Sequence, residues 1–288
     1  KEVDPSTGQM SVLEANSGLG NIDGITIDCY GNFITASWSP SQITMWDPEF
    51  SGPGIDLAIP GIGNPADIDF DVVLMVGVGA ANAGELVVGS RGIAFVCLEH
   101  FTGVANPDTQ GLGLDPELIP LWLAHELAHV VRYTSPESRS ELHQLIGESG
   151  GEYSYWDTGR RASLRELLLN EGLAVHTSQQ ISPGHAAWEY YGYARRQYAR
   201  VRELEGILSR VTQGDLDRSG LGLRLKYLSG GMSDEARTVD KYVMPERAGY
   251  YLGARMVEPA VSERGLAWAI RASADELRAV AKGAAASA

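Results

Sequence analysis

LWLAHELAHVVRY, residues 121–133, combines an apolar helix-like pattern with two histidines and a glutamate in the order H-E-x-x-H. Residues four positions apart lie on one face of an α-helix, so His125 and His129 are expected to project together. The dipeptide Asp115-Pro116 supplies an N-cap and a first-turn proline, which predicts a helix from there to the end of the stretch. The motif is either a pair of satisfied core histidines beside a chance glutamate or a metal site.

The chemistry of the motif favours a divalent metal ion, with zinc preferred. Zn²⁺ is bound well by two imidazoles and a carboxylate, although other divalent ions would also fit such a site. Glu126 follows His125 directly and would reach a metal-bound water molecule. A zinc site needs a third protein ligand, and the residues after His129, VVRYTSPESRS, contain no histidine. We therefore expect one Zn²⁺ per chain, with a third ligand from another segment.

Residues 163–181, SLRELLLNEGLAVHTSQQI, contain the strongest candidate for that ligand. Ser163 and Glu166 form a capping box that predicts the start of a second helix. Glu171 falls on an apolar stripe of this helix, where a carboxylate is costly unless a cation compensates its charge. Gly172 beside it would let another backbone come close. We expect Glu171 to be the third ligand, and the other candidates are the remaining carboxylates and His100, His143, His176 and His185.

The two motifs together resemble the glutamate-zincins (gluzincins), and more narrowly a bacterial family of predicted Zn-dependent proteases. The resemblance covers roughly residues 72–280, and its specific elements are HELAH at 125–129, NEGLA at 170–174, GIAFVCLEHF at 92–101 and PERAGYYLGARMVE at 245–258. It implies a zincin-like domain with a small β-sheet and helices that carry the two motifs. It also implies His125, His129 and Glu171 as zinc ligands. The separation of 42 residues between His129 and Glu171 is about twice that of the better-known gluzincins.

The same resemblance implies roles for residues outside the two motifs. Glu126 would be the general base that activates a zinc-bound water for hydrolysis of a peptide bond. Tyr250 or Tyr251 would stabilise the oxyanion, and Arg247 would contact the substrate or orient a ligand. An edge strand before the motif helix pairs with the substrate in this family. The strand that ends at Val96 and Cys97 is therefore a predicted substrate-binding element.

The first seventy residues contain an internal repeat. GLGN at 18–21 recurs as GIGN at 61–64, Asp4-Pro5 recurs as Asp47-Pro48, and N-x-x-x-I-x-Φ-D at 21–28 (Φ, apolar) recurs at 64–71, all with one offset of 43 residues. This period matches a four-stranded propeller blade. The stretch DGITIDCYGNFITASWSPSQITMWDP resembles NHL-type and senescence-marker-protein-like β-propellers, with a hairpin around Tyr-Gly-Asn. About one and a half blades are expected, either as a truncated propeller fused to the next domain or as blades that pack on it.

The sequence pattern changes near residue 71. We therefore predict a partial propeller-like domain at residues 1–71 and a zincin-like α+β metallopeptidase domain at 72–288. Two strands are expected within residues 72–101, which contain the short apolar runs VVLMVGVG and GIAFVCLEHF.

Composition excludes several classes of partner. A formal net charge of −14 argues against nucleic acid and anionic membranes. The sequence has no run of 18 apolar residues and no visible secretion signal. We therefore expect a soluble bacterial protein, either cytoplasmic or exported by a signal outside this chain, of undetermined oligomeric state. The two cysteines, Cys29 and Cys97, are expected to be buried thiols.

These observations favour a zinc metallopeptidase that acts on a peptide or protein substrate. The alternative is a non-catalytic binding protein derived from a propeller, with a metal-binding peptidase-like domain. An intact H-E-x-x-H favours the enzyme, because a protein that only binds has no physical need for Glu126.

Overall fold

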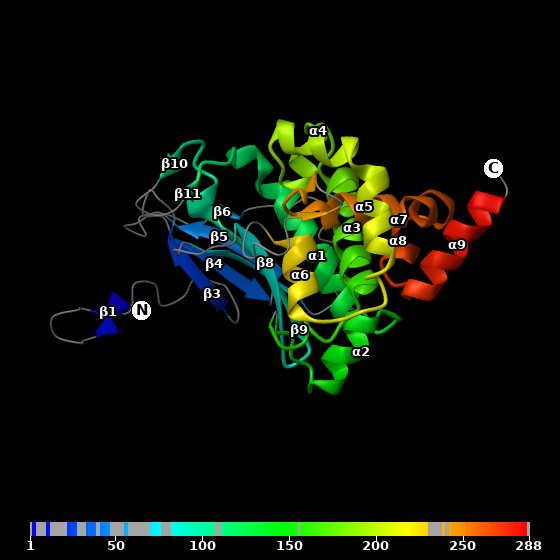
Figure 1. The fold of residues 1–288 in the computed structure, drawn as a ribbon. Helices are drawn as coiled ribbons and strands as arrows, with labels where there is room; N and C mark the ends of the chain where they lie inside the picture. Colours follow the sequence, from blue (N-terminus) through cyan, green and yellow to red (C-terminus); the bar gives the residue numbers. More distant parts are fainter. Residues whose placement is uncertain are drawn as a thin grey trace.

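The structure is a computed structural model of the 288-residue chain. It describes the backbone at residues 2–3, 10–11, 22–27, 33–38, 41–46, 55–56, 70–75, 82–106, 111–154, 156–229, 238–239 and 242–286. Side chains are described at residues 72–75, 82–106, 111–154, 156–229 and 244–283. Most strands lie on one side of the molecule and most helices on the other (Figure 1). The architecture is mixed α+β, with many helices and small sheets.

The described strands of the N-terminal region form an antiparallel meander. Two short strands, β1 (Glu2–Val3) and β2 (Met10–Ser11), precede a four-stranded sheet of β3 (Ile22–Ile27), β4 (Phe33–Trp38), β5 (Ser41–Trp46) and β6 (Ile55–Asp56). β3 pairs antiparallel with β4, which confirms the predicted hairpin. A four-stranded sheet is the unit of a propeller blade. The second copy of the repeat lies mostly outside the described residues, so the propeller assignment stays a prediction.

A second sheet leads into the helical region. It contains β7 (Phe70–Met75), β8 (Ala83–Val88) and β9 (Arg91–Cys97) in the order β7-β9-β8. β7 runs parallel to β9, and β8 pairs antiparallel with it. β7 begins one residue before the predicted boundary at 71, and β8 is a strand that the sequence pattern did not predict.

This order corrects the prediction for Val96 and Cys97. β9 is the middle strand: its register with β7 includes both residues, its register with β8 includes Val96, and the Cys97 backbone N–H donates to the Asn82 carbonyl oxygen on the β8 side. A strand that is paired on both sides has no free backbone edge to offer a substrate, so the expected role of these residues as part of an edge strand is wrong. Val96 and Cys97 are buried core residues, and Cys97 is a free thiol, as predicted. Cys29 lies outside the described residues.

Helices and short turns account for most of the chain after residue 97. The helices are α1 (Ile119–Thr134), α2 (Glu141–Glu148), α3 (Leu164–Ile181), α4 (Arg195–Glu203), α5 (Glu205–Gln213), α6 (Leu221–Leu228), α7 (Ala248–Arg264), α8 (Leu266–Ala269) and α9 (Ala274–Ala286). The 3-10 turns are η1 (Leu98–His100), η2 (Pro116–Leu118) and η3 (Glu189–Tyr191), and the short strands are β10 (Ala105–Asn106), β11 (Gly111–Leu112), β12 (Thr238–Val239) and β13 (Tyr242–Val243).

The helix α1 forms the centre of the described fold. It packs on β8 and β9 on one side and on α3 on the other, and α3 packs in turn on α7 (Figure 1). The predicted cap is present one turn earlier: the Asp115 carboxylate accepts a hydrogen bond from the Glu117 backbone N–H at 2.9 Å and so caps η2, which leads into α1 at Ile119. Gly92 of β9 lies under Val130, and a Cβ there would come within 2.3 Å of the Val130 side chain. Small residues thus let the helix lie close to the sheet.

Two polar contacts fix the antiparallel register of α1 and α3. At one end, the Ser178 hydroxyl donates a hydrogen bond to the Leu121 carbonyl oxygen at 3.0 Å. At the other, the buried Arg132 guanidinium donates to both carboxylate oxygens of Glu166, with a shortest distance of 2.8 Å. Arg132 also donates to two carbonyl oxygens, those of Ile270 and Ala272. All its donors are therefore used, as a buried guanidinium requires.

The capping box at the start of α3 is present in part. The Ser163 hydroxyl accepts a hydrogen bond from the Glu166 backbone N–H at 3.2 Å, as predicted. The Glu166 side chain does not complete the box, because it pairs with Arg132. Glu141 of α2 takes its place and accepts the Ser163 backbone N–H at 3.0 Å.

Two glycines let the backbones of α3 and α7 touch. A Cβ on Gly172 would lie 2.2 Å from the Gly253 carbonyl carbon, and a Cβ on Gly253 would lie 1.9 Å from the Leu168 carbonyl oxygen. Both distances are too short for real contacts. The expectation that Gly172 allows another backbone to come close is confirmed.

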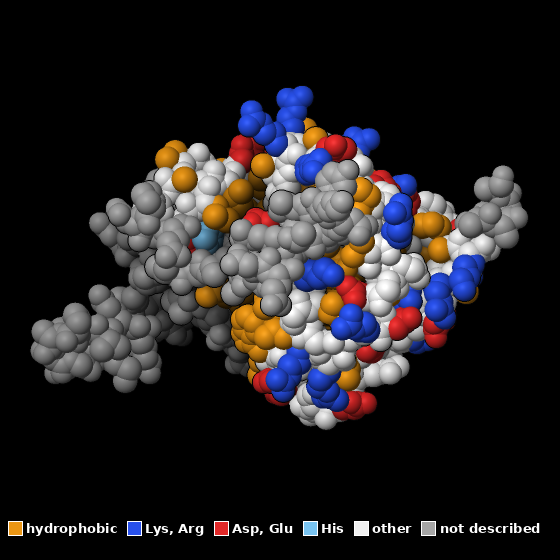
Figure 2. All heavy atoms as spheres, in the orientation of Figure 1, with side chains coloured by type: hydrophobic (Ala, Val, Ile, Leu, Met, Phe, Trp, Pro, Cys, Tyr) orange, Lys and Arg blue, Asp and Glu red, His pale blue; other side chains and the backbone are white. Residues whose placement is uncertain are grey.

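The described surface carries charges of both signs. In the face shown in Figure 2, Lys and Arg side chains alternate with Asp and Glu over the helical part. Several form pairs within one helical turn, such as Arg200 with Glu203 and Arg278 with Asp275. Within the described residues, no helix is both long enough and apolar enough to cross a membrane.

The glycine contact yields a prediction with a matched control. Gly253→Ala should lower the free energy of unfolding by about 1–3 kcal/mol or more, because the new methyl group meets backbone that cannot move aside. Gly206→Ala in α5 should instead raise it by up to about 1 kcal/mol, because a Cβ there has no neighbour within 4 Å. Urea denaturation of both variants measures the difference. Equal effects of the two substitutions would contradict the close α3–α7 contact.

Candidate metal centre

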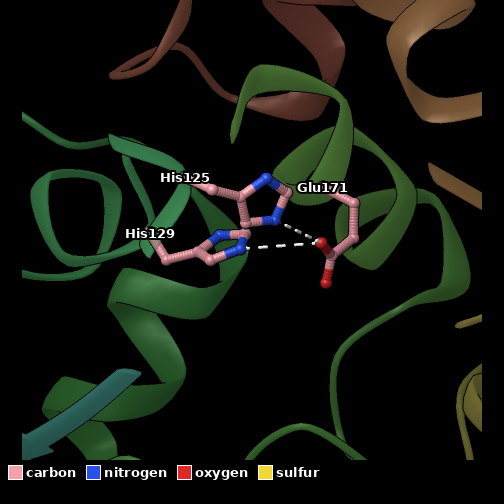
Figure 3. Close-up of side chains that lie close together, drawn as sticks. All are labelled: His125, His129 and Glu171. Carbon is pink, nitrogen blue, oxygen red and sulfur yellow. Dashed lines mark hydrogen bonds and ion pairs between the residues drawn. The ribbon is translucent and has the colours of Figure 1, made fainter. Parts of the chain in front are cut away.

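Three buried side chains from α1 and α3 meet in the core. Figure 3 shows His125 and His129 on one helix turned toward Glu171 on the other. The Nε2 atom of His125 lies 3.2 Å from Oε2 of Glu171, and Nε2 of His129 lies 3.6 Å from the same oxygen. One ligand atom from each residue lies within 4.8 Å of the others. Their side chains are at most 10% exposed, so this cluster is enclosed by protein.

Aromatic rings hold the two imidazoles in place. The ring of Tyr250 stacks on His125 with centroids 5.9 Å apart, and Trp122 lies 5.7 Å from His125 on its own helix. Tyr133 stacks on His129 at 6.0 Å. Among the described residues, neither Nδ1 atom has a hydrogen-bond partner. Ring packing rather than a hydrogen bond to Nδ1 therefore directs both Nε2 atoms toward Glu171.

Burial and mutual attraction determine how this cluster is charged without a metal. Burial opposes the charge on Glu171, but His129 and His125 outweigh it and hold the pKa of the carboxyl well below its usual range. Burial also works against a proton on His129, yet the Glu171 carboxylate raises the pKa of His129 to about 10. The pKa of His125 is lowered, chiefly by burial. Glu171 is therefore ionised in this cluster, and its charge favours a proton on His129.

Glu126 lies beside this cluster and pairs with a residue that sequence reasoning missed. The residue is 5% exposed, and the pKa of its carboxyl is raised well above the usual range by burial and then by the neighbouring carboxyl group of Glu85. Glu85 lies on β8 two residues before the fully buried Val87, so the two side chains point to the same face of the sheet. An acidic residue at a core-facing strand position could have indicated a functional role for Glu85, but the sequence pattern did not predict β8.

A chain of hydrogen bonds connects Glu85 to the second motif. The Tyr133 hydroxyl donates to the Glu85 carboxyl at 3.1 Å, and Asn170 donates to the same hydroxyl at 2.9 Å. Asn170 directly precedes Glu171 in the N-E-G sequence. The asparagine thus links α3 to α1 and β8, which fixes the position of Glu85 relative to the histidines.

The structure separates the two candidate tyrosines. Tyr250 stacks on His125, and its pKa is raised by burial and then by the charge of Glu171. Tyr251 points away from the cluster: its hydroxyl donates to Glu205 at 2.8 Å and it lines a separate cavity of about 790 Å³. Arg247 lies near the cluster, with its guanidinium carbon 4.3 Å from the centroid of the Tyr250 ring. Tyr250 and Arg247 are therefore brought to the site, and Tyr251 is not.

The other histidines are engaged elsewhere. His100 accepts a hydrogen bond from the backbone N–H of Leu112, and Nδ1 of His143 lies 2.7 Å from the Tyr133 carbonyl oxygen. Nε2 of His176 lies 3.1 Å from the Ala254 carbonyl oxygen, and that of His185 lies 3.0 Å from the Ser182 hydroxyl. In the part of the chain that the structure describes, only His125, His129 and Glu171 form a group that could hold a metal ion.

No protein-family model, curated protein or solved structure matches this chain at a significant level. The chemical interpretation of the site therefore depends on its own geometry. Two imidazole nitrogens and a carboxylate oxygen converge in a buried space, and they are donors that a divalent transition metal prefers. The residues present fit such an ion.

Metal binding should release a proton. His129 must be neutral to act as a ligand, so a metal displaces the proton that Glu171 holds on it. Glu171 is already ionised and His125 already neutral near pH 7, so we expect about one proton released per ion. Since the pKa of His129 is about 10, apparent affinity should rise about tenfold per pH unit below that value.

Calorimetric titration of the metal-free protein with Zn²⁺, in buffers of different ionisation enthalpy, measures the number of protons. The His143→Ala variant serves as a control and should release the same number. A binding enthalpy that does not depend on the buffer would contradict the protonated state of His129.

Proposed function

We propose that this protein is a zinc-dependent peptidase of the gluzincin type. The observation that carries the proposal is the convergence of His125, His129 and Glu171, with the carboxyl group of Glu126 beside them on the same helix. A purely structural cluster would need no second carboxyl group there. Burying one costs free energy, and a hydrolytic base is a function that accounts for this cost.

A zinc ion held by the three ligands would polarise a scissile carbonyl group and lower the pKa of water, while three protein ligands leave a fourth position open. The protein's own groups supply the rest of the reaction. Glu126 accepts the proton of the attacking water and passes it to the leaving nitrogen. Positive charge beside Glu126 stabilises its ionised form and so counteracts the effects of burial and of Glu85.

Tyr250 is the better candidate for stabilising the oxyanion. Its raised pKa keeps the hydroxyl protonated, so the hydroxyl remains a donor at neutral pH. Its ring is fixed between His125 and Arg247, which positions the donor before the reaction begins. Tyr251 lacks this position because its hydroxyl bonds Glu205.

The strand that pairs with the substrate is β8 in this proposal. β8 is the edge strand next to α1, and among the described residues its outer side is bridged only at Val87, by Tyr153. Residues 83–86 can therefore add an extended peptide by backbone hydrogen bonds. Glu85 would then lie within the strand that holds the substrate.

The proposal predicts a separation of metal binding from catalysis. Glu126→Gln should retain zinc at about one ion per chain but lower turnover by about 10²–10⁴-fold, because the amide cannot accept a proton. Turnover is measured by mass spectrometry on a mixed peptide library with the zinc-loaded protein. Full activity in this variant would show that Glu126 is not the base.

Two tyrosine variants provide a matched pair for the same assay. Tyr250→Phe should lower kcat by about 10²–10³-fold, whereas Tyr251→Phe should leave kcat within about threefold of the unmodified protein. If the unmodified protein binds zinc and hydrolyses no peptide in the library, the non-catalytic binding protein becomes the better account.

A further inference from the structure

Arg247 occupies a strained backbone position at the start of α7. Its φ of 55° and ψ of 22° lie in the left-handed region, which residues other than glycine rarely adopt. The Tyr193 hydroxyl donates a hydrogen bond to the Arg247 carbonyl oxygen and helps to hold this conformation. Strain of this kind persists where the surrounding structure requires it, and it is concentrated at functional sites.

In this conformation the Arg247 guanidinium is separated from His125 of the candidate metal site by the Tyr250 ring. The guanidinium carbon lies 4.3 Å from the centroid of Tyr250 and 6.0 Å from that of Trp122. Both rings also contact His125. The Arg247 side chain therefore packs on the same two rings that contact His125, a candidate ligand.

A glycine makes room for this side chain. Gly192 has a φ of 61°, and a Cβ there would come within 2.8 Å of the Trp122 ring and 3.0 Å of Nη1 of Arg247. The close approach and the positive φ both require glycine. Gly192 and Tyr193, at the end of the 188–193 segment, thus both lie against Arg247.

Within the described residues, Arg247 forms no ion pair with an acidic side chain, unlike the buried Arg132, which is paired with Glu166. Glu171 of the cluster directs its Oε2 atom toward the two histidines. An arginine cannot lose its charge in a protein, so a partly buried guanidinium without an acidic partner favours an anion that arrives from outside.

We propose that Arg247 binds a carboxylate group of the substrate, so that preferred substrates are short peptides with a carboxylate close to the scissile bond. This inference rests on the proposed peptidase function. The planar guanidinium matches a carboxylate with two parallel hydrogen bonds, and stacking on Tyr250 fixes its plane. A chain with a net charge of −14 repels anions in general, so an acidic substrate needs a local cation of this kind.

The carboxylate has two possible sources, the free C-terminus of a peptide or an acidic side chain. Three N-acetylated pentapeptides of alanine and leucine separate them: one with a free C-terminal carboxylate, one with a C-terminal amide, and one amidated with a single internal aspartate. The zinc-loaded protein should cleave at least one carboxylate-bearing peptide with a kcat/KM about 100-fold above that of the neutral amide. The peptide that shows the preference identifies the source.

Variants of Arg247 test the assignment. Arg247→Gln should remove the preference, so that acid and amide peptides differ by less than about threefold, while Arg247→Lys should keep part of it. Arg264→Gln is the matched control, since this arginine also lies over an aromatic ring, 4.6 Å from the Trp268 centroid, at the far end of α7. It should leave the preference unchanged. Zinc content and thermal midpoint show whether each variant is folded.

Failure of the carboxylate inference can be distinguished from failure of the peptidase proposal. If neutral and carboxylate-bearing peptides are cleaved equally well, and Arg247→Gln changes nothing, the carboxylate inference is wrong and the peptidase proposal stands. If no peptide is cleaved, the peptidase proposal fails, and calorimetric binding of the same peptides to the zinc-loaded protein decides the inference. Binding that depends on the carboxylate and is lost in Arg247→Gln would support it. Equal binding of the neutral and carboxylate-bearing peptides, or no binding, would overturn it.

Discussion

The antiparallel register of α1 and α3 is the constraint on which the candidate site depends. Ser178 bonds the Leu121 carbonyl oxygen at one end, and the Arg132–Glu166 pair joins the two helices at the other. The candidate metal site, formed by His125, His129 and Glu171, lies between these contacts. A shift of either helix by one residue would rotate its side chains by about 100° and would separate Glu171 from both imidazoles. Buried ion pairs add little net stability, but they are well suited to specifying a register of this kind.

The same helices bring ionisable side chains together in the protein core, where burial of a charged group is normally unfavourable. The Glu171 carboxylate favours a proton on His129, and two further carboxyl groups, those of Glu126 and Glu85, lie close together beside this cluster. A divalent cation would satisfy both demands, because it replaces the proton and stabilises ionised Glu126. Metal binding and the proposed reaction would account for the cost of burying these groups.

Much of the local structure could be predicted from the sequence, because it depends on short-range patterns. Helix periodicity predicted α1 and its two histidines. The cap at Asp115 and the proline at 116 mark η2, the turn that leads into α1 at Ile119. A glutamate on an apolar stripe predicted that Glu171 would meet the histidines, as it does. The order of strands β7-β9-β8 could not be predicted, because it depends on long-range pairing that no local pattern encodes. Glu85 was missed for the same reason. Adjacent Tyr250 and Tyr251 could not be ranked until packing showed which side of α7 faces the histidines.

Zinc affinity of a Glu171 variant tests the central claim most directly. The unmodified protein and Glu171→Gln are compared by chelator competition with Zn²⁺, and Glu258→Gln, at an exposed position on α7, serves as the control. The account predicts about one ion per chain for the unmodified protein and the control, and an affinity at least about 100-fold weaker for Glu171→Gln, since even loss of an outer-shell partner costs about 10–100-fold. Unchanged zinc affinity in Glu171→Gln would contradict the convergence of the three ligands on one ion.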